Sequence, residues 1–356
     1  MSTSRVEGAG IFQFDSCFYH DQINKVIDFI LPQYDRIIRK YVLLNILFLS
    51  FGFTQIILLI GFFSFLVQSS LVAISLAILF LTLFSYFMLR IYLQTKKPEE
   101  FDEIQEKYFR ACHNFLNYQA DIPEHNVALA NACCKFAKKL EGREYHIYPI
   151  PKWLDFLAPS LERFSCWWHW LDLHYMKEIL LLSAVEEHIK LVKSEPTNLE
   201  VHVALANSYV MLSHLYMDPR KGESDEEERW APSEELQKEL QRKFRLTVER
   251  VIEEFKILSD YAPDDPWVHA QLAYSYHDLQ MPQEEIREYE TIIKLRPGDK
   301  EAFFKLGFLY FQQGQNAQGL SIYEELKRTN YKKAESLIDH YGDFRPLNQA
   351  IKPFFH

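Results

Sequence analysis

The sequence predicts an all-α protein in which a two-helix transmembrane hairpin precedes a solenoid of helical pairs. Three observations predict this class. The chain has only 11 glycines in 356 residues, which disfavours tightly turned β architectures. Residues 41–89 contain no charged side chain, and such a run is long enough for membrane helices. Towards the C-terminus, a pattern of apolar and aromatic residues recurs every 34 positions, as expected of a helical repeat array.

The charge of the chain is divided between a weakly basic N-terminal part and an acidic remainder. Residues 1–97 hold 8 Lys and Arg against 5 Asp and Glu, a net charge of +3. The whole chain has a net charge of −10, so residues 98–356 carry −13. Non-specific nucleic-acid binding needs basic side chains that neutralise phosphates, so we expect no nucleic-acid partner. The five cysteines contain no CxxC pair and fit neither a disulfide framework nor a four-thiolate zinc site.

The uncharged run predicts two membrane spans, because a bilayer core of about 30 Å needs about 20 apolar residues per helix. We expect a hairpin over residues 41–93, with the first span at 41–67, a turn at 68–70 and the second span at 71–93. Two polar residues, Asn45 and Gln55, lie inside the first span. We expect these side chains to hydrogen-bond across the hairpin or to lie exposed at the interface. The alternative, a transport path, is disfavoured because a transporter needs more spans and usually buried charges.

Basic residues flank the spans on their outer sides: Arg36, Arg39, Lys40, Arg90, Lys96 and Lys97. Lys and Arg near span ends remain on the cytosolic side. We therefore expect an integral membrane protein with both termini cytosolic, in a membrane that the sequence does not identify. The polar lead of about 40 residues, without a small-residue cleavage site, argues against a removable signal peptide.

Helices are also expected on either side of the hairpin. Residues 1–40 are expected to form a cytosolic amphipathic helix that is interrupted at Pro32. Pro98 and Pro123 each precede apolar residues at helical spacing, so residues 98–145 are expected to form a helical hairpin with a proline at the start of each helix.

Residues 146–171 form an aromatic-rich connector that contains four of the six tryptophans, between Trp153 and Trp170. Tryptophan is frequent at membrane interfaces and also suits dense packing. Two interpretations therefore stay open: a helix that lies at the membrane interface, or packing that caps the first repeat.

The 34-residue repeat is clearest near the C-terminus. Leu272, Ala273, Tyr276 and Tyr289 recur as Leu306, Gly307, Tyr310 and Tyr323. This pattern resembles the tetratricopeptide repeat (TPR) family, in which each unit pairs two helices and small residues at the eighth and twentieth positions allow close packing. Gly307 and Gly319 fit those two positions, whereas Glu285 stands at the small twentieth position of the preceding unit.

The resemblance extends over roughly 170 residues, and we assign a TPR-like solenoid to residues 172–340. The unit before Leu272 is split by an acidic insertion at 218–235, which is either a surface loop or a docking site for a basic partner. Residues 341–356 form a C-terminal tail.

The resemblance implies a concave groove, lined by the first helices of the units, that binds a protein or peptide. The candidate groove residues are His202, Asn207, His269, Tyr276, Phe304, Lys305 and Phe308. Clamp-type members of the family hold a terminal carboxylate with basic and amide side chains. Asn207 and Lys305 match those positions, and Gln271, in place of Asn, is a near match. Val203 and Glu301 do not match. We therefore expect recognition of an internal or helical segment through aromatic anchors.

No motif in the sequence indicates catalysis. P-loop, HExxH and nucleophile-elbow patterns are absent. Cys166, His169 and His174 are close in sequence, but two histidines five apart on a helix face about 140° away from each other. We expect no enzyme activity, cofactor or metal site.

These features together predict a membrane-anchored scaffold or adaptor that binds a protein or peptide on the cytosolic side. Two closely spaced spans with cytosolic termini also resemble the inclusion-membrane proteins of intracellular bacteria. A secreted protein that displays its repeats to a host cytosol is therefore an alternative. An enzyme whose catalytic groups converge from distant positions is the third.

Overall fold

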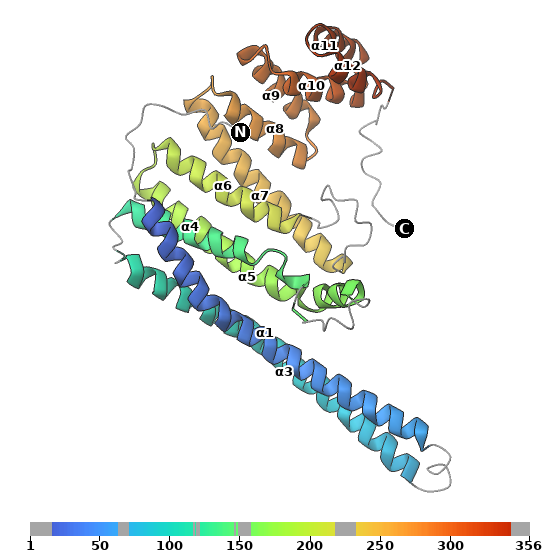
Figure 1. Cartoon of the computed structure of the whole chain (residues 1–356). Coiled ribbons are helices and arrows are strands. Elements are labelled where there is room, and N and C mark those ends of the chain that lie inside the picture. The colour runs from blue at the N-terminus through green and yellow to red at the C-terminus, as the bar shows by residue number, and fades with distance from the viewer. Residues whose placement is uncertain are drawn as a thin grey trace. The chain divides into compact units, whose positions relative to one another are not determined.

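The computed structural model describes most of the chain, in the segments 16–62, 71–116, 118, 122–145, 147–148, 158–217 and 233–342. Within these segments the regular structure is helical and contains no strand, which confirms the all-α prediction (Figure 1). The expected turn at 68–70, residues 218–232 of the acidic insertion, Trp153 and most of the tail lie outside the described residues. The chain divides into two compact units, Met1–Glu187 with Asp225–Trp230, and His188–Ser224 with Ala231–His356.

The first unit contains two helices of 46 residues, α1 (Ser16–Gly61) and α3 (Leu71–Leu116), which lie side by side (Figure 1). A helix of this length spans about 69 Å, more than twice the thickness of a bilayer core. Each helix therefore extends well beyond its uncharged stretch. The unit also contains α4 (Pro123–Lys139), a short 3-10 turn (Arg143–Tyr145) and most of α5 (Ala158–Ser194).

Both α1 and α3 continue through a proline, which corrects the sequence prediction. Pro32 lies inside α1 and does not interrupt it, and Pro98 lies inside α3 and does not start a helix. A proline within a helix removes one backbone hydrogen bond, but buried residues on both sides hold one helical register, as Ile30 and Tyr34 do around Pro32. Pro123 stands at the start of α4, as predicted.

The second unit is an array of helical pairs. Its helices are α6 (Leu199–Tyr216), α7 (Glu234–Tyr261), α8 (Pro266–Asp278), α9 (Pro282–Leu295), α10 (Lys300–Gln312), α11 (Asn316–Thr329) and α12 (Tyr331–Ile338). The pairs are α6 with α7, α8 with α9, and α10 with α11. Adjacent pairs also contact each other, and α12 packs on the last pair. This packing gives a TPR-like solenoid, in which each pair buries its apolar face against its neighbours.

The first helices of the three pairs begin in the same way. Asn198, Asp265 and Asp299 precede α6, α8 and α10, and each side chain accepts a hydrogen bond from the backbone N–H two residues later. Such N-caps satisfy a donor that the helix itself leaves unpaired. The repeat in the sequence is therefore also a repeat of helix start signals.

Two glycines confirm the predicted small positions of the last pair. A Cβ on Gly319 would lie 2.4 Å from the Phe311 ring, and a Cβ on Gly307 would lie 2.6 Å from a Leu337 methyl and 3.0 Å from an Ile322 methyl. Ile322 lies on the second helix of the pair and Leu337 lies on α12. Glycine at these two positions therefore allows the close helix contacts that side chains would block.

Candidate functional site

The first helices of the pairs carry all seven predicted groove residues. Asn207 and Tyr274 occupy the ninth position of α6 and α8, and both are exposed. The Lys305 ammonium on α10 lies 4.6 Å from the centre of the Tyr274 ring, within the range of a cation–π contact. We call Asn207, Tyr274, Phe304, Lys305 and Phe308 the first-helix face. It offers an amide, a cation and aromatic rings.

His202 and His269 are buried, and their assignment to the groove is revised. In His202, Nδ1 lies 2.7 Å from a Glu254 carboxylate oxygen and Nε2 lies 3.1 Å from the Pro196 carbonyl oxygen. In His269 the same atoms lie 2.7 Å from Glu288 and 2.8 Å from the carbonyl oxygen of Pro263. Both rings thus join a loop to the second helix of their own pair.

Burial opposes charge on the His202 ring, but its hydrogen bonds to Glu254 and to the Pro196 carbonyl outweigh this effect. The pKa of His202 is therefore raised above its ordinary value. An imidazolium can donate from both nitrogens to these two acceptors, whereas a neutral ring can donate from only one.

Tyr276 is also buried, 6% exposed, and packs in the apolar cluster that contains Phe255 and Leu272. Its equivalent Tyr310 is 5% exposed and donates a hydrogen bond to Glu290 at 2.6 Å. The eleventh position therefore fills the core of the array, and Tyr276 is removed from the candidate binding surface.

Phe304 and Phe308 are half-buried, because α12 covers part of the surface around them. Both pack against a cluster that includes Phe311 and Leu337. The His340 ring meets the Phe308 ring edge-on, with 4.7 Å between their centres. These two aromatic residues therefore contribute to the packing of the last helices as well as to the first-helix face.

Glu301 has a partner that changes the argument about a carboxylate clamp. Its carboxylate forms an ion pair with Lys333 of α12. Since this pairing offsets the negative charge, Glu301 repels an incoming anion near Lys305 less than the sequence alone implied.

Tyr274 and Trp267 were missed in the sequence analysis. Trp267 is 41% exposed at the second position of α8, and Tyr274 is 47% exposed at the ninth. The register set by Leu272 and Ala273 at the seventh and eighth positions contained the signal, because it places Tyr274 at the position that Asn207 occupies one unit earlier.

The hairpin of the first unit contains the two predicted polar contacts. Tyr86 of α3 donates a hydrogen bond to Asn45 of α1 at 3.2 Å. Gln55 of α1 donates to the Thr82 hydroxyl of α3 at 3.0 Å. The expectation that Asn45 and Gln55 bond across the hairpin is confirmed.

A polar network lies where the uncharged run ends. Lys97 of α3 forms an ion pair at 2.7 Å with Asp172 of α5, and both side chains are largely buried. The His169 ring bridges Asp172 and the Tyr148 hydroxyl at 3.2 Å each. On the hairpin side, the Tyr41 hydroxyl donates to Glu100 at 3.0 Å. The network therefore holds α5 and residues 147–148 against the hairpin.

The clustered side chains Cys166, His169 and His174 have structural roles in α5. Cys166 and His174 are both buried in α5. His174 stacks on Trp170 with 4.5 Å between the ring centres, while His169 is engaged in the network. Over the described part of the chain, no group of three or more His, Cys, Asp and Glu side chains is placed to hold a metal ion.

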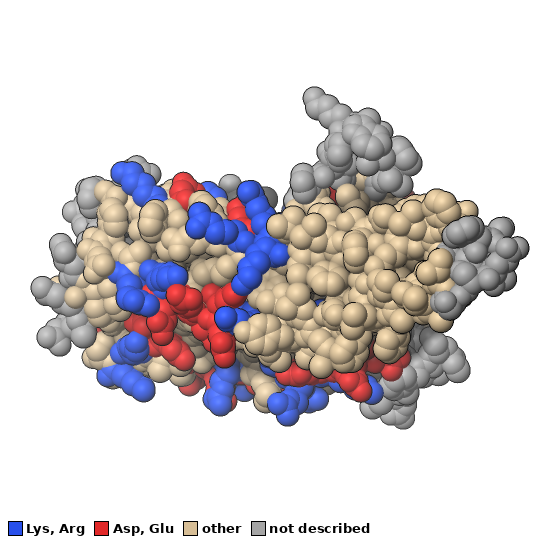
Figure 2. All heavy atoms as spheres, turned by 90° about the horizontal axis from the view of Figure 1, so that it is seen from below, with Lys and Arg blue, Asp and Glu red and all other residues tan. Residues whose placement is uncertain are grey.

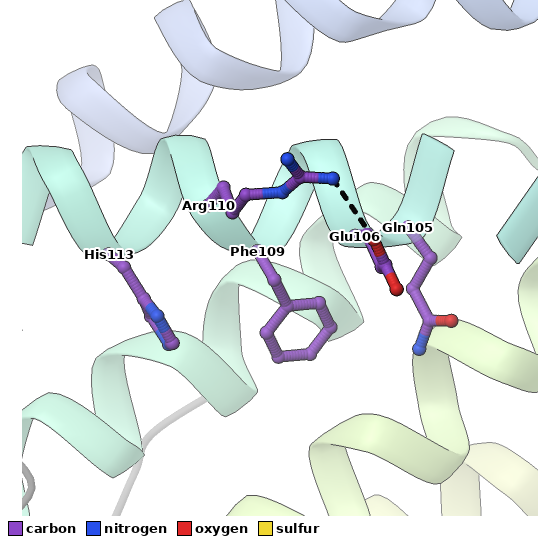
Figure 3. Close-up of a pocket in the computed structure, with 5 residues that line it drawn as sticks. All are labelled: Gln105, Glu106, Phe109, Arg110 and His113. Carbon is purple, nitrogen blue, oxygen red and sulfur yellow. Dashed lines mark hydrogen bonds and ion pairs between the residues drawn. The ribbon is translucent and has the colours of Figure 1, made fainter. Parts of the chain in front are cut away.

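A surface depression of about 300 Å³ lies along α3 and is lined by Gln105, Glu106, Phe109, Arg110 and His113 (Figure 3). Arg110 bonds to Glu106 at 3.0 Å within the same helix. Ligand sites usually combine polar groups that converge from several elements. A depression lined from one helix does not have that property.

No protein-family model matches the chain, and no curated protein shows significant similarity to it. Solved structures of MamA resemble parts of it at low identity. One, a crystal structure of MamA protein, is 15% identical and covers 68% of this chain and 96% of that chain, with a TM-score of 0.30. Another, MamA AMB-1, is 16% identical and covers 65% and 100%, with a TM-score of 0.29. At these TM-scores the similarity decides neither fold nor function, and the repeat assignment rests on the packing of the helices themselves.

Proposed function

We propose that this protein is a membrane-anchored adaptor: the α1–α3 hairpin spans a bilayer, and the helical array binds a protein or peptide in the cytosol. The observation that carries the proposal is the contrast in burial between the two units. The array encloses its apolar residues between helices, whereas the uncharged stretches of the hairpin expose theirs.

The membrane part is supported by length, composition and exposure. α1 and α3 are both long and apolar enough to cross a bilayer, and none of the most apolar 18-residue stretch of α3 is buried. A core helix of a water-soluble protein would bury such a stretch. Seen from below, a broad surface without charged side chains meets Lys, Arg, Asp and Glu on its left and lower sides (Figure 2).

The partner-binding part is supported by the first-helix face. Exposed Tyr274 and half-buried Lys305 lie together, and tyrosine is among the residues that contribute most binding energy at protein interfaces. Phe304 and Phe308 lie on the neighbouring first helix. This combination favours a peptide segment that offers an apolar side chain next to an acidic group.

The test is photo-cross-linking in intact membranes, with a photoreactive residue at position 274 and, as a control, at position 261. Tyr261 is 61% exposed but ends α7, a second helix. We expect one protein to be captured at 274 and not at 261, and the capture to weaken in a Lys305→Ala background. Equal capture at both positions, or none at 274, would contradict the proposed binding face.

A further inference from the structure

The beginning of α5 contacts the hairpin where the uncharged run meets the charged residues. The Arg90 guanidinium lies 4.1 Å from the centre of the Trp168 ring. Tyr148, just before α5, lies beside Asn45 of α1. Arg90 is the first charged residue after the uncharged run, and Asn45 is the fifth residue within it.

These contacts fix the depth of α5 along the hairpin axis. Asn45 lies four helical steps, about 6 Å, beyond the first residue of the uncharged run. This depth is comparable to one polar layer of a bilayer, which is about 5–8 Å thick. If the hairpin spans a membrane, Trp168 and Tyr148 are therefore level with the lipid headgroups on the cytosolic side.

The outer face of α5 is apolar at this depth. Trp167 is 51% exposed and Leu171, one helical turn later, is 54% exposed. The Phe164 ring lies next to the Trp167 ring, with 6.1 Å between their centres. Trp combines an apolar ring with one polar N–H group and is enriched at membrane–water interfaces.

Asp172, the acidic residue adjacent to Leu171, does not oppose contact with lipid. Asp172 follows Leu171 directly, but its carboxylate pairs with Lys97 and with the His169 ring inside the protein. Arg163, one turn before Trp167, is exposed on the same side of the helix. A basic residue beside apolar ones suits a surface of phosphate headgroups.

We propose that the face formed by Trp167 and Leu171 lies in the headgroup region of the bilayer, as a third membrane contact beside the two spans. This inference rests on the proposed membrane anchoring. The lipid occupant follows from the continuity of this face with the apolar surface of the hairpin, through the Arg90–Trp168 contact.

The test uses the full chain in phosphatidylcholine–phosphatidylglycerol vesicles, with one nitroxide spin label per protein. Cys17 and Cys134 are replaced by Ser to limit background labelling, since the thiols of Cys112, Cys133 and Cys166 are buried. Labels are placed by Leu171→Cys, Leu182→Cys and Leu81→Cys. Leu182 is the matched control, because it is 41% exposed on the same helix but about 16 Å further along it. Leu81 reports on the span.

Accessibility to oxygen, which concentrates in lipid, and to a water-soluble nickel chelate gives the depth of each label. We expect the label at 171 to become at least threefold less accessible to nickel than the label at 182, and more accessible to oxygen. Equal nickel accessibility at 171 and 182, with lipid exposure at 81, would overturn this inference alone. Water exposure at 81 would overturn the membrane anchoring. Shielding of 171 from both reagents in detergent and vesicles alike would indicate a protein neighbour and would also overturn the inference.

Discussion

The hairpin and the helical array are built from the same element, a pair of antiparallel helices, but they place their apolar side chains on opposite sides. Phe255 in the array is fully buried between α7 and its neighbours, whereas Phe80 in the hairpin is 71% exposed. In the hairpin, polar contacts such as Gln55 with Thr82 also connect the two helices. The comparison indicates that the position of the apolar face on each helix distinguishes a pair that packs in water from a pair suited to lipid.

The largest expected effect comes from removing a buried ring in the array. Phe255→Ala should lower the free energy of unfolding of the array by about 3–5 kcal/mol, because it leaves a cavity in a packed core. The same change at exposed Phe80 should leave the array unaffected. Thermal unfolding of both full-length variants in detergent, followed by circular dichroism, measures the difference, and equal losses would break the comparison.

An introduced charge should have the opposite pattern of effects, harming the hairpin and sparing the array. Leu81→Arg, near the middle of the second span, should disfavour membrane insertion by about 2.5–3.5 kcal/mol. Leu320→Arg is its counterpart on exposed α11, where Leu320 is 37% exposed, and should be tolerated. The measurement is the fraction of each variant that resists carbonate extraction from membranes. Full retention of Leu81→Arg would argue that this surface does not face lipid.

Two units of the array differ at the turn between their helices. Gly314 has a φ of 73°, and Gln280, 34 residues earlier, has a φ of 58°. A residue with a side chain destabilises the fold by about 1–2 kcal/mol in this left-handed region. Glycine avoids that strain but destabilises the fold by about 0.5–1 kcal/mol, because its unfolded chain has more conformational entropy to lose. Gln280→Gly should therefore stabilise by about 0.5–1 kcal/mol and Gly314→Ala should destabilise, as measured by urea unfolding. A destabilising Gln280→Gly would contradict this reading of the turn.

The smallest expected effect is a difference between units in how their stability depends on pH. The pKa of His202 is raised in the folded protein, so its stabilising contribution is complete below the unfolded value of about 6.5 and is lost as pH rises through the folded value. The last pair has Phe303 at the equivalent position. His202→Phe should therefore reduce the fall in unfolding temperature between pH 6 and pH 8. An unchanged pH profile would show that this ring does not carry the dependence.

The sequence predicted those features of the fold that depend on local patterns. The 34-residue period located the pairs, and the small positions Gly307 and Gly319 lie at close helix contacts as expected. Pro32 and Pro98 were misjudged because packing against other helices, which no local rule includes, keeps α1 and α3 continuous.

The candidate binding residues were predicted less well, for a physical reason. His202 and His269 are polar residues on first helices, and the sequence does not show that Glu254 and Glu288 on second helices bind them. The polar network of Lys97, Asp172, His169 and Tyr148 joins residues up to 75 positions apart, a distance over which residue spacing carries no signal.

The measurement that tests the central claim most directly is the topology of the full chain in sealed membranes. The basic flanks predict that both ends of the hairpin lie on one side. Cysteines introduced at exposed Lys25 and exposed Tyr331, in a background with Cys17 and Cys134 replaced, are treated with a membrane-impermeant maleimide from the cytosolic face. We predict that both positions are labelled without detergent. Labelling of Tyr331→Cys together with protection of Lys25→Cys would mean that the chain crosses the membrane an odd number of times, and would contradict the hairpin.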